Sequence, residues 1–442
     1  MLKYPGVSMI PRPSIPIREA AFPAPFTPGL EYSPPARGMW NIVHTGMLIP
    51  ESHQIFICAR GCLRGVILTA AEMNAMDRMS WAAIDEQDFL GRGLEDSVLD
   101  GCTHILQKMA KKPRCVLVFF SCVQLFAGVD IPLLMEELRS RFPEMDFVDC
   151  YMHPTMRKSG LTPDQKMRVQ LYDALRPCPV RPRTAAIIGN NLATEESSEL
   201  IQFLKHQNWE LRDLTSCRTY DEYLQLAECE LYLTTSPAAK PAGEILAQRL
   251  GRKHLHLPLA YHPEEIRRNI RQLADAMDCA VPDLDAEEAL AAKELVNALN
   301  VVKDTPISID YTATPRPASL TRMLVENGFK VERLYLDVMI PDEEPHFRWL
   351  QSHCPELQIR PTVHPAMRFE PQPLNSPALA IGQKAAYFDG TPHFVNVIEG
   401  GGLYGFSGIA GLAKEMIRAT EVKKEIEQTI RRKGLGCESC LV

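Results

Sequence analysis

Residues 183–214 decide the fold. They read RTAAIIGNNLATEESSELIQFLKHQNWELRDL, and residues 304–336 repeat the same order of patterns in DTPISIDYTATPRPASLTRMLVENGFKVERLYL. In each stretch a short apolar run leads through a loop of small and polar residues into a helical pattern, and a second apolar run follows. Two such openings predict two similar domains in which strands alternate with helices.

The same alternation precedes residue 180. The apolar run QIFICA at 54–59 is followed by a helical pattern at 63–76, and RCVLVFFSC at 114–122 is followed by another at 130–142. Strand followed by helix, repeated along the chain, is typical of parallel sheets with helices on both faces. We therefore predict an α/β protein with three Rossmann-like or flavodoxin-like domains.

Domain boundaries are expected at two stretches whose composition suits a linker. They are LRPCPVRPRT at 175–184 and CAVPDLDAEEAL at 279–290. The predicted domains are residues 37–180, 181–285 and 286–442.

Residues 1–36 contain nine prolines. This density excludes a helix and a central strand and favours an extended segment. Such a segment is either disordered or laid across a partner surface, and the interleaved Ile, Phe and Tyr residues favour the second. We predict a Pro-rich arm that lies on a partner chain instead of folding back on its own.

The composition excludes several classes of protein. The 442 residues carry a formal net charge of −7, and no Lys/Arg block is longer than RRK at 431–433, so a nucleic-acid partner is not expected. No apolar run approaches the length of a membrane span, and prolines interrupt the N-terminus before a signal peptide forms, which predicts a cytoplasmic location. Thirteen cysteines, an odd number, are too sparse for a disulfide-stapled secreted domain.

Three cysteines are the first candidates for chemistry. Cys62 forms a Gly-Cys step just after the predicted strand that contains Cys58, and Cys122 stands at the carboxyl end of the next strong strand. Ligands of open α/β sheets bind at the carboxyl ends of strands, and several thiolates there suit an iron–sulfur cluster. The alternative for each cysteine is a small buried hydrophobe.

The stretch EGGGLYG at 399–405 places Gly400, Gly402 and Gly405 in G-x-G-x-x-G spacing before a single long helix predicted over 407–434. No strand with an acidic ribose ligand follows, so nicotinamide binding is the weaker interpretation and a tight backbone turn the stronger. No G-x-x-x-x-G-K-[ST] occurs, so we do not expect ATP hydrolysis through a P-loop.

Two further motifs have weaker metal interpretations. His254 and His256 lie on one face of a probable strand with His262 nearby, where they either hold a metal or occupy an edge or loop. Cys437 and Cys440 form a C-x-x-C near the C-terminus, without a second cysteine pair beside it.

With these features together, the sequence resembles the component-1 family of nitrogenases and nitrogenase-like reductases over about residues 40–420. The stretches that carry the resemblance are IFICARGC (55–62), DEQDFLGRGLEDSVLDG (85–101), FFSCVQLFAGVDI (119–131), residues 187–211 and GGLYGFSGIAGLA (401–413). The resemblance implies three α/β domains and pairing with a homologous component-1 subunit, in a hetero-oligomer or a homodimer. It also implies an iron–sulfur cluster, [4Fe-4S] or larger, at the subunit interface.

Within this resemblance, the 60 residues from Cys62 to Cys122 suit the family's second and third cluster cysteines. The region around Arg37 and Gly38, where a further cluster cysteine is usual, has none. Cys58 is either a substitute ligand or a core residue, and the partner chain is another source of ligands.

The nitrogenase α chain anchors its iron–molybdenum cofactor with one cysteine and one histidine. At the matching places this sequence has Ser236 and Tyr404, which implies a β-type or divergent subunit. The leading hypothesis is a subunit of a nitrogenase-like reductase. A separate ATP-hydrolysing iron protein would pass electrons to the cluster at Cys62 and Cys122, and from there to a substrate or second cofactor in the cleft between the domains. The alternative is a non-catalytic metallocluster assembly scaffold or structural partner.

Overall fold

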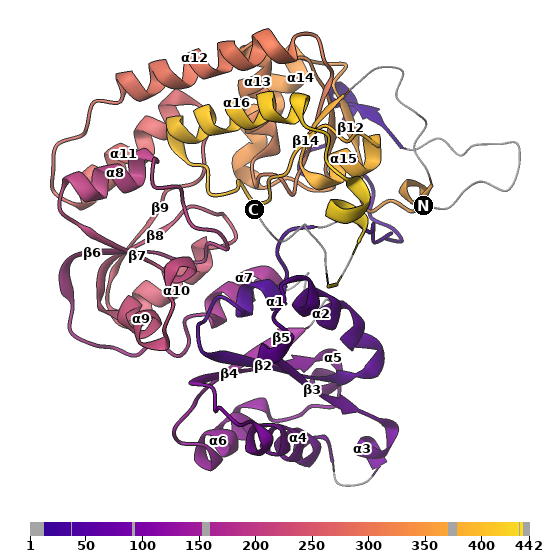
Figure 1. Cartoon of the computed structure of the whole chain (residues 1–442), viewed down its shortest axis with the longest axis vertical. Coiled ribbons are helices and arrows are strands. Elements are labelled where there is room, and N and C mark those ends of the chain that lie inside the picture. The colour runs from indigo at the N-terminus through magenta and orange to yellow at the C-terminus, as the bar shows by residue number, and fades with distance from the viewer. Residues whose placement is uncertain are drawn as a thin grey trace, which may run out of the picture.

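A computed structural model describes residues 13–36, 38–90, 93–152, 160–369, 378–432 and 434–435. Three sheets form the centres of three bodies that follow one another along the chain, except that the N-terminal strand β1 (Ile15–Pro16) joins the third sheet (Figure 1). The strands of each sheet are parallel apart from one short edge strand, so the predicted α/β architecture is confirmed. The residues at which one domain gives way to the next stay predictions.

The first sheet has the strand order β3-β2-β4-β5. Its strands are β2 (Ser52–Ala59), β3 (Met79–Ile84), β4 (Cys115–Ser121) and β5 (Asp146–Met152). Nearly every residue of the central strands β2 and β4 is buried, as expected for a parallel sheet with both faces covered.

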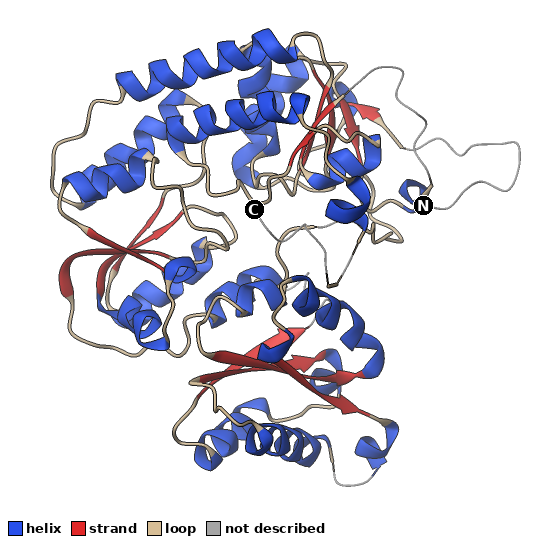
Figure 2. Cartoon of the chain, viewed as in Figure 1, coloured by secondary structure: helices blue, strands red, loops and turns tan. Residues whose placement is uncertain are grey.

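Helices cover both faces of this sheet (Figure 2). One face carries α1 (Ile42–Gly46), α2 (Arg60–Glu72) and α7 (Pro163–Gln170), and the other carries α4 (Leu94–Lys108) and α6 (Ile131–Arg141). Two short helices, α3 (Glu86–Leu90) and α5 (Cys122–Phe126), follow strand ends.

The second sheet has the order β7-β6-β8-β9. Its elements are β6 (Arg181–Ile187), α8 (Glu199–His206), β7 (Glu210–Asp213), α9 (Tyr220–Leu224), β8 (Cys229–Thr234), α10 (Lys240–Leu250), β9 (Lys253–His256) and the following α11 (Pro263–Ala276). Its apolar side chains belong to two cores, one shared with the first body and one with the third. The second body therefore holds the other two together.

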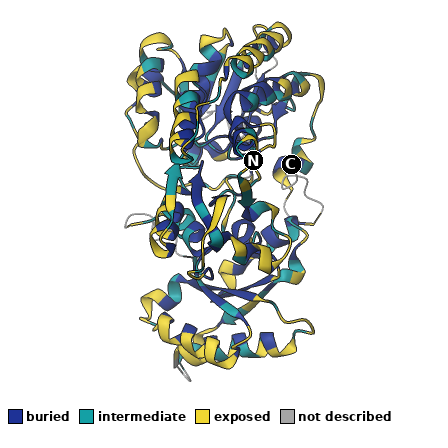
Figure 3. Cartoon of the chain, turned by 90° about the vertical axis from the view of Figure 1, so that its left-hand side faces the viewer, coloured by how far each residue is buried: buried dark blue, intermediate teal, exposed yellow. Residues whose placement is uncertain are grey.

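The third sheet has the order β1-β12-β11-β10-β13-β14. Its strands are β1 (Ile15–Pro16), β10 (Ile307–Asp310), β11 (Val331–Tyr335), β12 (Gln358–Arg360), β13 (Leu379–Ile381) and β14 (Phe394–Val395). Its helices are α12 (Asp285–Val302), α13 (Pro317–Glu326), α14 (Glu344–His353), α15 (Gln383–Asp389) and α16 (Gly405–Glu421). Figure 3 shows the buried strands of the sheets and the exposed outer faces of the helices.

The described part of the Pro-rich arm lies on its own chain, so the prediction of a partner-bound arm is wrong for residues 13–36. Ile15 and Pro16 pair antiparallel with β12, and the side chain of Ile17 is fully buried. Phe22 contacts the ring of Phe347 with centroids 5.5 Å apart. A proline is tolerated here because β1 is an edge strand.

The long C-terminal helix predicted over 407–434 is also wrong, because α16 ends at Glu421. The chain then turns toward the edge of the third sheet. The Lys424 backbone N–H donates to Pro392 O at 2.9 Å, and its ammonium donates to Phe394 O at 2.7 Å. These contacts with the sheet replace the helical hydrogen bonds that the sequence pattern alone would predict. Among the described residues, no helix is both long and apolar enough to cross a membrane.

Candidate functional site

The structure brings Cys58, Cys62 and Cys122 to one edge of the first sheet. Cys58 is the penultimate residue of β2, Cys62 lies in the first turn of α2, and Cys122 begins α5 directly after β4. β2 and β4 are parallel neighbours, with Ile57 opposite Phe120, so their carboxyl ends meet. The strand-end thiols therefore lie at the same sheet edge, as the sequence predicts. Metal binding by these thiols stays a prediction.

Gln124 fixes the two strand ends relative to one another. Its side-chain oxygen accepts hydrogen bonds from the Ser121 backbone N–H at 2.9 Å and the Ser121 hydroxyl at 2.7 Å, while its amide donates to Ile57 O at 3.0 Å. Gln124 is fully buried, so these bonds are not exposed to competition from water. Sequence reasoning missed this residue, although Ser-x-x-Gln after an apolar run is a capping-box signature.

The three thiols differ in exposure. Cys58 is fully buried, Cys122 is partly exposed and Cys62 is exposed. Burial, with the nearby charges of Cys62 and Cys122, raises the pKa of the Cys58 thiol to about 12. Cys62 is exposed and lies in the first turn of the 13-residue helix α2. Cys62 and Cys122 are thus the more accessible thiols, whereas Cys58 belongs to the core of the first body.

These residues fit part of an iron–sulfur site. Thiolates are the ligands that such clusters take, and two of the three are accessible from outside. Across the described residues, however, no group of three or more His, Cys, Asp or Glu side chains is arranged to hold a metal. A cluster here would need ligands from elsewhere.

A cavity of about 40 Å³ lies where the three bodies meet. Its lining comes from all three, and includes Trp40, Asn190, Thr235, Ser236, Pro315 and Tyr404. Counted as space for the centres of water molecules, this volume suits about three waters. A substrate or second cofactor in this cleft stays a prediction.

Glu399 binds the three bodies together beside this cavity. Its carboxylate accepts hydrogen bonds from the Trp40 backbone N–H at 3.1 Å, the Arg168 guanidinium at 3.1 Å and the Asn191 amide at 3.0 Å. The Arg168 side chain is 1% exposed, so its pairing with Glu399 is largely shielded from solvent. Three partners from other parts of the chain converge on one carboxylate.

Ser236 and Tyr404, which the sequence resemblance places at the cofactor-anchor positions, both line the cavity. Ser236 follows β8, and Tyr404 directly precedes α16. The Tyr404 hydroxyl donates to Leu257 O at 3.1 Å and accepts from the Asn269 amide at 3.1 Å. Tyr404 is thus a structural residue that joins the second and third bodies.

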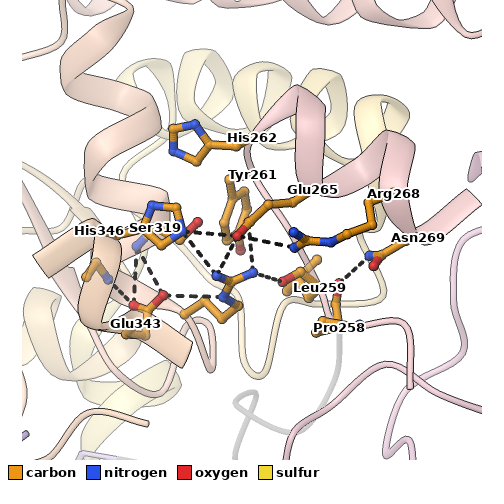
Figure 4. A network of polar contacts seen from close by, with 12 residues as sticks. Pro258, Leu259, Tyr261, His262, Glu265, Arg268, Asn269, Ser319, Glu343 and His346 are labelled. Carbon is orange, nitrogen blue, oxygen red and sulfur yellow. Dashed lines mark hydrogen bonds and ion pairs between the residues drawn. The ribbon is translucent and has the colours of Figure 1, made fainter. Parts of the chain in front are cut away.

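A buried ionic network reaches Leu259, one of the residues that line the cavity (Figure 4). Arg316 donates to Leu259 O at 3.2 Å, to Glu265 at 2.9 Å and to Glu343 at 3.3 Å. Glu343 also accepts from the Ser319 backbone N–H, so it caps α13. Burial raises the pKa of Glu343, while hydrogen bonds from His346 and Arg316 lower that of Glu265 to about 2.

The glycine-rich stretch forms a turn, which confirms the stronger sequence interpretation. Gly400, Gly402 and Gly405 all have positive φ angles, of 86°, 79° and 74°. A Cβ at Gly402 would lie 2.3 Å from Ala193 O. The Gly402 carbonyl accepts from the Glu195 backbone N–H at 2.9 Å. These glycines therefore permit close contact between the second and third bodies.

Gly402→Ala is expected to lower the free energy of unfolding by about 2–4 kcal/mol. The added methyl group would clash with the backbone of Ala193, and the positive φ angle is unfavourable for a residue with a Cβ. Denaturant unfolding measures this. Gly65→Ala in α2 is the matched control, since nothing lies within 4 Å of its Cβ. We expect it to leave stability unchanged or to raise it by up to about 1 kcal/mol. Equal effects of the two variants would contradict the packing role.

The histidines named as metal candidates have other partners. His254 Nε2 and His256 Nδ1 lie 2.9 and 3.0 Å from the Thr234 hydroxyl, and burial lowers the pKa of His256 to about 4. His262 stacks on His346 with ring centroids 4.8 Å apart. They act here as hydrogen-bonding and stacking groups. Cys437 and Cys440 lie outside the described residues.

The sequence model of the family described as "Nitrogenase component 1 type Oxidoreductase" matches residues 44–371. The solved structure "Nitrogenase Cp1 at pH 6.5" superposes with a TM-score of 0.65 at 11% identity, covering 89% of this chain and 94% of that one. "Nitrogenase Cp1 at pH 5" gives 0.58 at 12% identity, covering 89% of each chain. No curated protein matches the sequence.

The two structural likenesses, at these identities, show a shared fold only. The family match is of a different kind, because it rests on the sequence and spans most of the chain. It includes the strand ends that carry the three thiols and the residues that line much of the central cavity. The chain belongs to the nitrogenase component 1 type oxidoreductases.

Proposed function

We propose that this chain is a subunit of a nitrogenase-like reductase complex that receives electrons from a separate ATP-hydrolysing iron protein through an iron–sulfur cluster. The observation that carries the proposal is the meeting of Cys58, Cys62 and Cys122 at the carboxyl ends of β2 and β4. Membership of an oxidoreductase family supports a redox role for these thiols.

The surface beside Cys122 supports a partner subunit. Leu125 and Phe126 follow Cys122 in α5 and are 47% and 74% exposed. Exposed apolar side chains of this size are typical of a protein–protein interface. Here they lie beside thiols that supply only part of the ligands that a cluster needs. We propose a homologous component-1 subunit there, as a second copy or a related chain, and a cluster that the two chains share.

The chain's own residues supply the environment of the site. Cys62 and Cys122 would bind iron as thiolates, Gln124 holds the two strand ends at a fixed separation, and buried Cys58 is the third candidate ligand. The cluster, when bound, supplies a one-electron carrier whose potential depends on its ligands and burial. Docking of a partner over Leu125 and Phe126 would exclude water from it.

Reductase activity is expected to require ATP although this sequence has no phosphate-binding P-loop. Under anaerobic conditions, this subunit with its partner, dithionite and ATP should be inactive until the iron protein is added. A non-hydrolysable ATP analogue should abolish turnover again. Reduction of a substrate by NADH without a second component would contradict the proposal.

The second candidate function is a metallocluster assembly scaffold or a structural partner, which the lack of a further cysteine around Arg37 and Gly38 favours. A scaffold would transfer its cluster to an apo-enzyme and show no turnover with the iron protein. The complex purified anaerobically, assayed for turnover and for cluster transfer, separates the two. We also propose a cytoplasmic location, which fractionation of the native host tests.

A further inference from the structure

A cavity of about 440 Å³ lies on the third sheet. It is lined by the first residues of β11, by β12 and by residues 354–357, which lead into β12. All of its lining residues therefore belong to the third body, whereas the thiols of the proposed cluster site belong to the first. Small-molecule sites of proteins have volumes of about 300–1,000 Å³, so this cavity has the size of a ligand site.

Two arginines of neighbouring strands lie on the same face of this sheet. In the parallel pairing of β11 with β12, Arg333 stands opposite Gln358, and Tyr335 stands opposite Arg360. Because side chains alternate between the two faces of a strand, both arginines share a face with Tyr335. The Tyr335 hydroxyl accepts from Arg360 Nη1 at 3.3 Å and donates to Asp389 Oδ1 at 2.6 Å. Arg333 Nε lies 3.3 Å from Asp389 Oδ2, so two guanidinium groups share one buried carboxylate.

Most of the N–H donors of these two guanidinium groups are unused. Each guanidinium carries five such donors. Among the residues that the structure describes, the side chain of Arg333 donates no hydrogen bond, although Arg333 is only 8% exposed, and that of Arg360 donates only the one to Tyr335. The Nε atoms of both arginines are buried without an acceptor. Buried donors are nearly always paired in folded proteins, so the unused donors indicate an acceptor that the described residues do not supply.

The charges around the cavity leave Arg360 without a carboxylate of its own. The two acidic residues that line the cavity already have cations. Glu332 lies 2.9 Å from the Lys330 ammonium, and Glu356 pairs with Arg18 of the Pro-rich arm. In the described part of the chain, the Tyr335 hydroxyl is the one hydrogen-bond partner of the Arg360 guanidinium. An anionic ligand would therefore find a cation here without displacing an existing ion pair.

We propose that this cavity binds the phosphate group of a small organic ligand between Arg333 and Arg360. The planar guanidinium fork matches the oxygens of a phosphate, and a tetrahedral oxyanion accepts hydrogen bonds from two such groups at once. Val331, Pro355 and Leu357 also line the cavity, and their apolar side chains suit the uncharged part of the ligand. No iron–sulfur cluster takes part, so this site does not depend on the proposed function.

Binding of inorganic phosphate to the full chain tests the proposal. Equilibrium dialysis at constant ionic strength, with chloride as the balancing anion, should show saturable binding to the wild type. Arg360→Gln should weaken that binding by about tenfold or more, because it removes a charged fork from the site. Arg348→Gln in α14 is the matched control, since the Arg348 side chain is 56% exposed and pairs with Glu344 outside the cavity lining. It should bind phosphate as the wild type does. Absence of saturable binding in the wild type, or equal affinity in Arg360→Gln, would overturn the inference.

A stability measurement separates loss of the site from loss of the fold. Phosphate should raise the denaturant midpoint of the wild type and of Arg348→Gln but not that of Arg360→Gln, because a ligand stabilises only a protein that binds it. Arg360→Lys is the second variant, because it keeps the charge and loses the planar fork. It should bind phosphate more weakly than the wild type. Equal midpoint shifts in all four proteins would overturn the inference.

The class of ligand is tested with two further anions. Phenyl phosphate should bind more tightly than inorganic phosphate by about fivefold or more, because the apolar walls remove its ring from water. Acetate should bind more weakly than phosphate by about tenfold or more, because it has one charge and two oxygens. Acetate binding as tight as phosphate binding would overturn the assignment to a phosphate. Phenyl phosphate binding no tighter than inorganic phosphate would overturn the assignment to an organic ligand.

Discussion

Serine at position 62 or 122 is expected to remove most of the iron bound by the anaerobically purified complex. A hydroxyl is a harder and weaker ligand for iron than a thiolate, and the loss of one bond weakens cluster binding by about tenfold or more. Iron and acid-labile sulfide per chain measure the effect. Because both thiols are accessible, neither substitution opens a cavity in the core, so stability of the metal-free chain should be unchanged.

A shared cluster also predicts weaker subunit association. A ligand that binds only the assembled complex stabilises it by mass action, so Cys62→Ser should raise the dissociation constant of the subunits together with the loss of iron. Analytical ultracentrifugation under anaerobic conditions shows this. Cys102→Ser is the control, because Cys102 is a fully buried thiol of α4 and lies in a separate core cluster. Iron loss from that variant equal to the loss from Cys62→Ser would contradict the site.

Cys58→Ser decides between the two roles left open for that thiol. Cys58 packs in the core of the first body, and its raised pKa shows that burial disfavours the bare thiolate. Partial loss of iron would make it a ligand, since metal binding offsets the cost of deprotonation. Full retention of iron with a lower free energy of unfolding would make it a core residue.

The sequence predicts those parts of this molecule that depend on local patterns. Strand and helix alternation gave the three parallel sheets, because side-chain periodicity and strand burial are properties of adjacent residues. The thiols of Cys62 and Cys122 were found in the same way, since each follows a strongly apolar strand. They lie at the same sheet edge because β2 and β4 are neighbouring strands, although β3 lies between them in the sequence.

The parts that were missed depend on contacts between distant residues. Nothing near Glu399 in the sequence indicates that Trp40, Arg168 and Asn191 will all donate to it. Likewise, nothing near Ile15 in the sequence indicates that it will pair with β12 at the edge of the third sheet. Local sequence patterns cannot predict such pairings, because each residue alone is compatible with many environments.

The buried Arg316 network predicts the largest effect on stability. Arg316→Met should lower the free energy of unfolding by about 3–5 kcal/mol, because it leaves the fully buried carboxylate of Glu343 without its cation. Arg322→Met, in the same helix, is the matched control. Its partner Glu326 is one helical turn away and partly exposed, so we expect a loss of less than about 1 kcal/mol.

The pH dependence of the stability loss in Arg316→Met tests whether the unpaired Glu343 carboxylate causes that loss. Burial already holds the pKa of Glu343 above its usual value, and removal of Arg316 should raise it further. A group whose folded-state pKa exceeds its unfolded value binds more protons when folded, so its contribution to stability is present at low pH and is lost as pH rises through the folded pKa. Arg316→Met should therefore be less destabilising at pH 5 than at pH 8. Adding Glu343→Gln, whose amide oxygen still accepts from the Ser319 N–H, should recover part of the loss and remove this difference. Equal losses at both pH values in the single variant would show that packing, and not the unpaired carboxylate, makes Arg316 important.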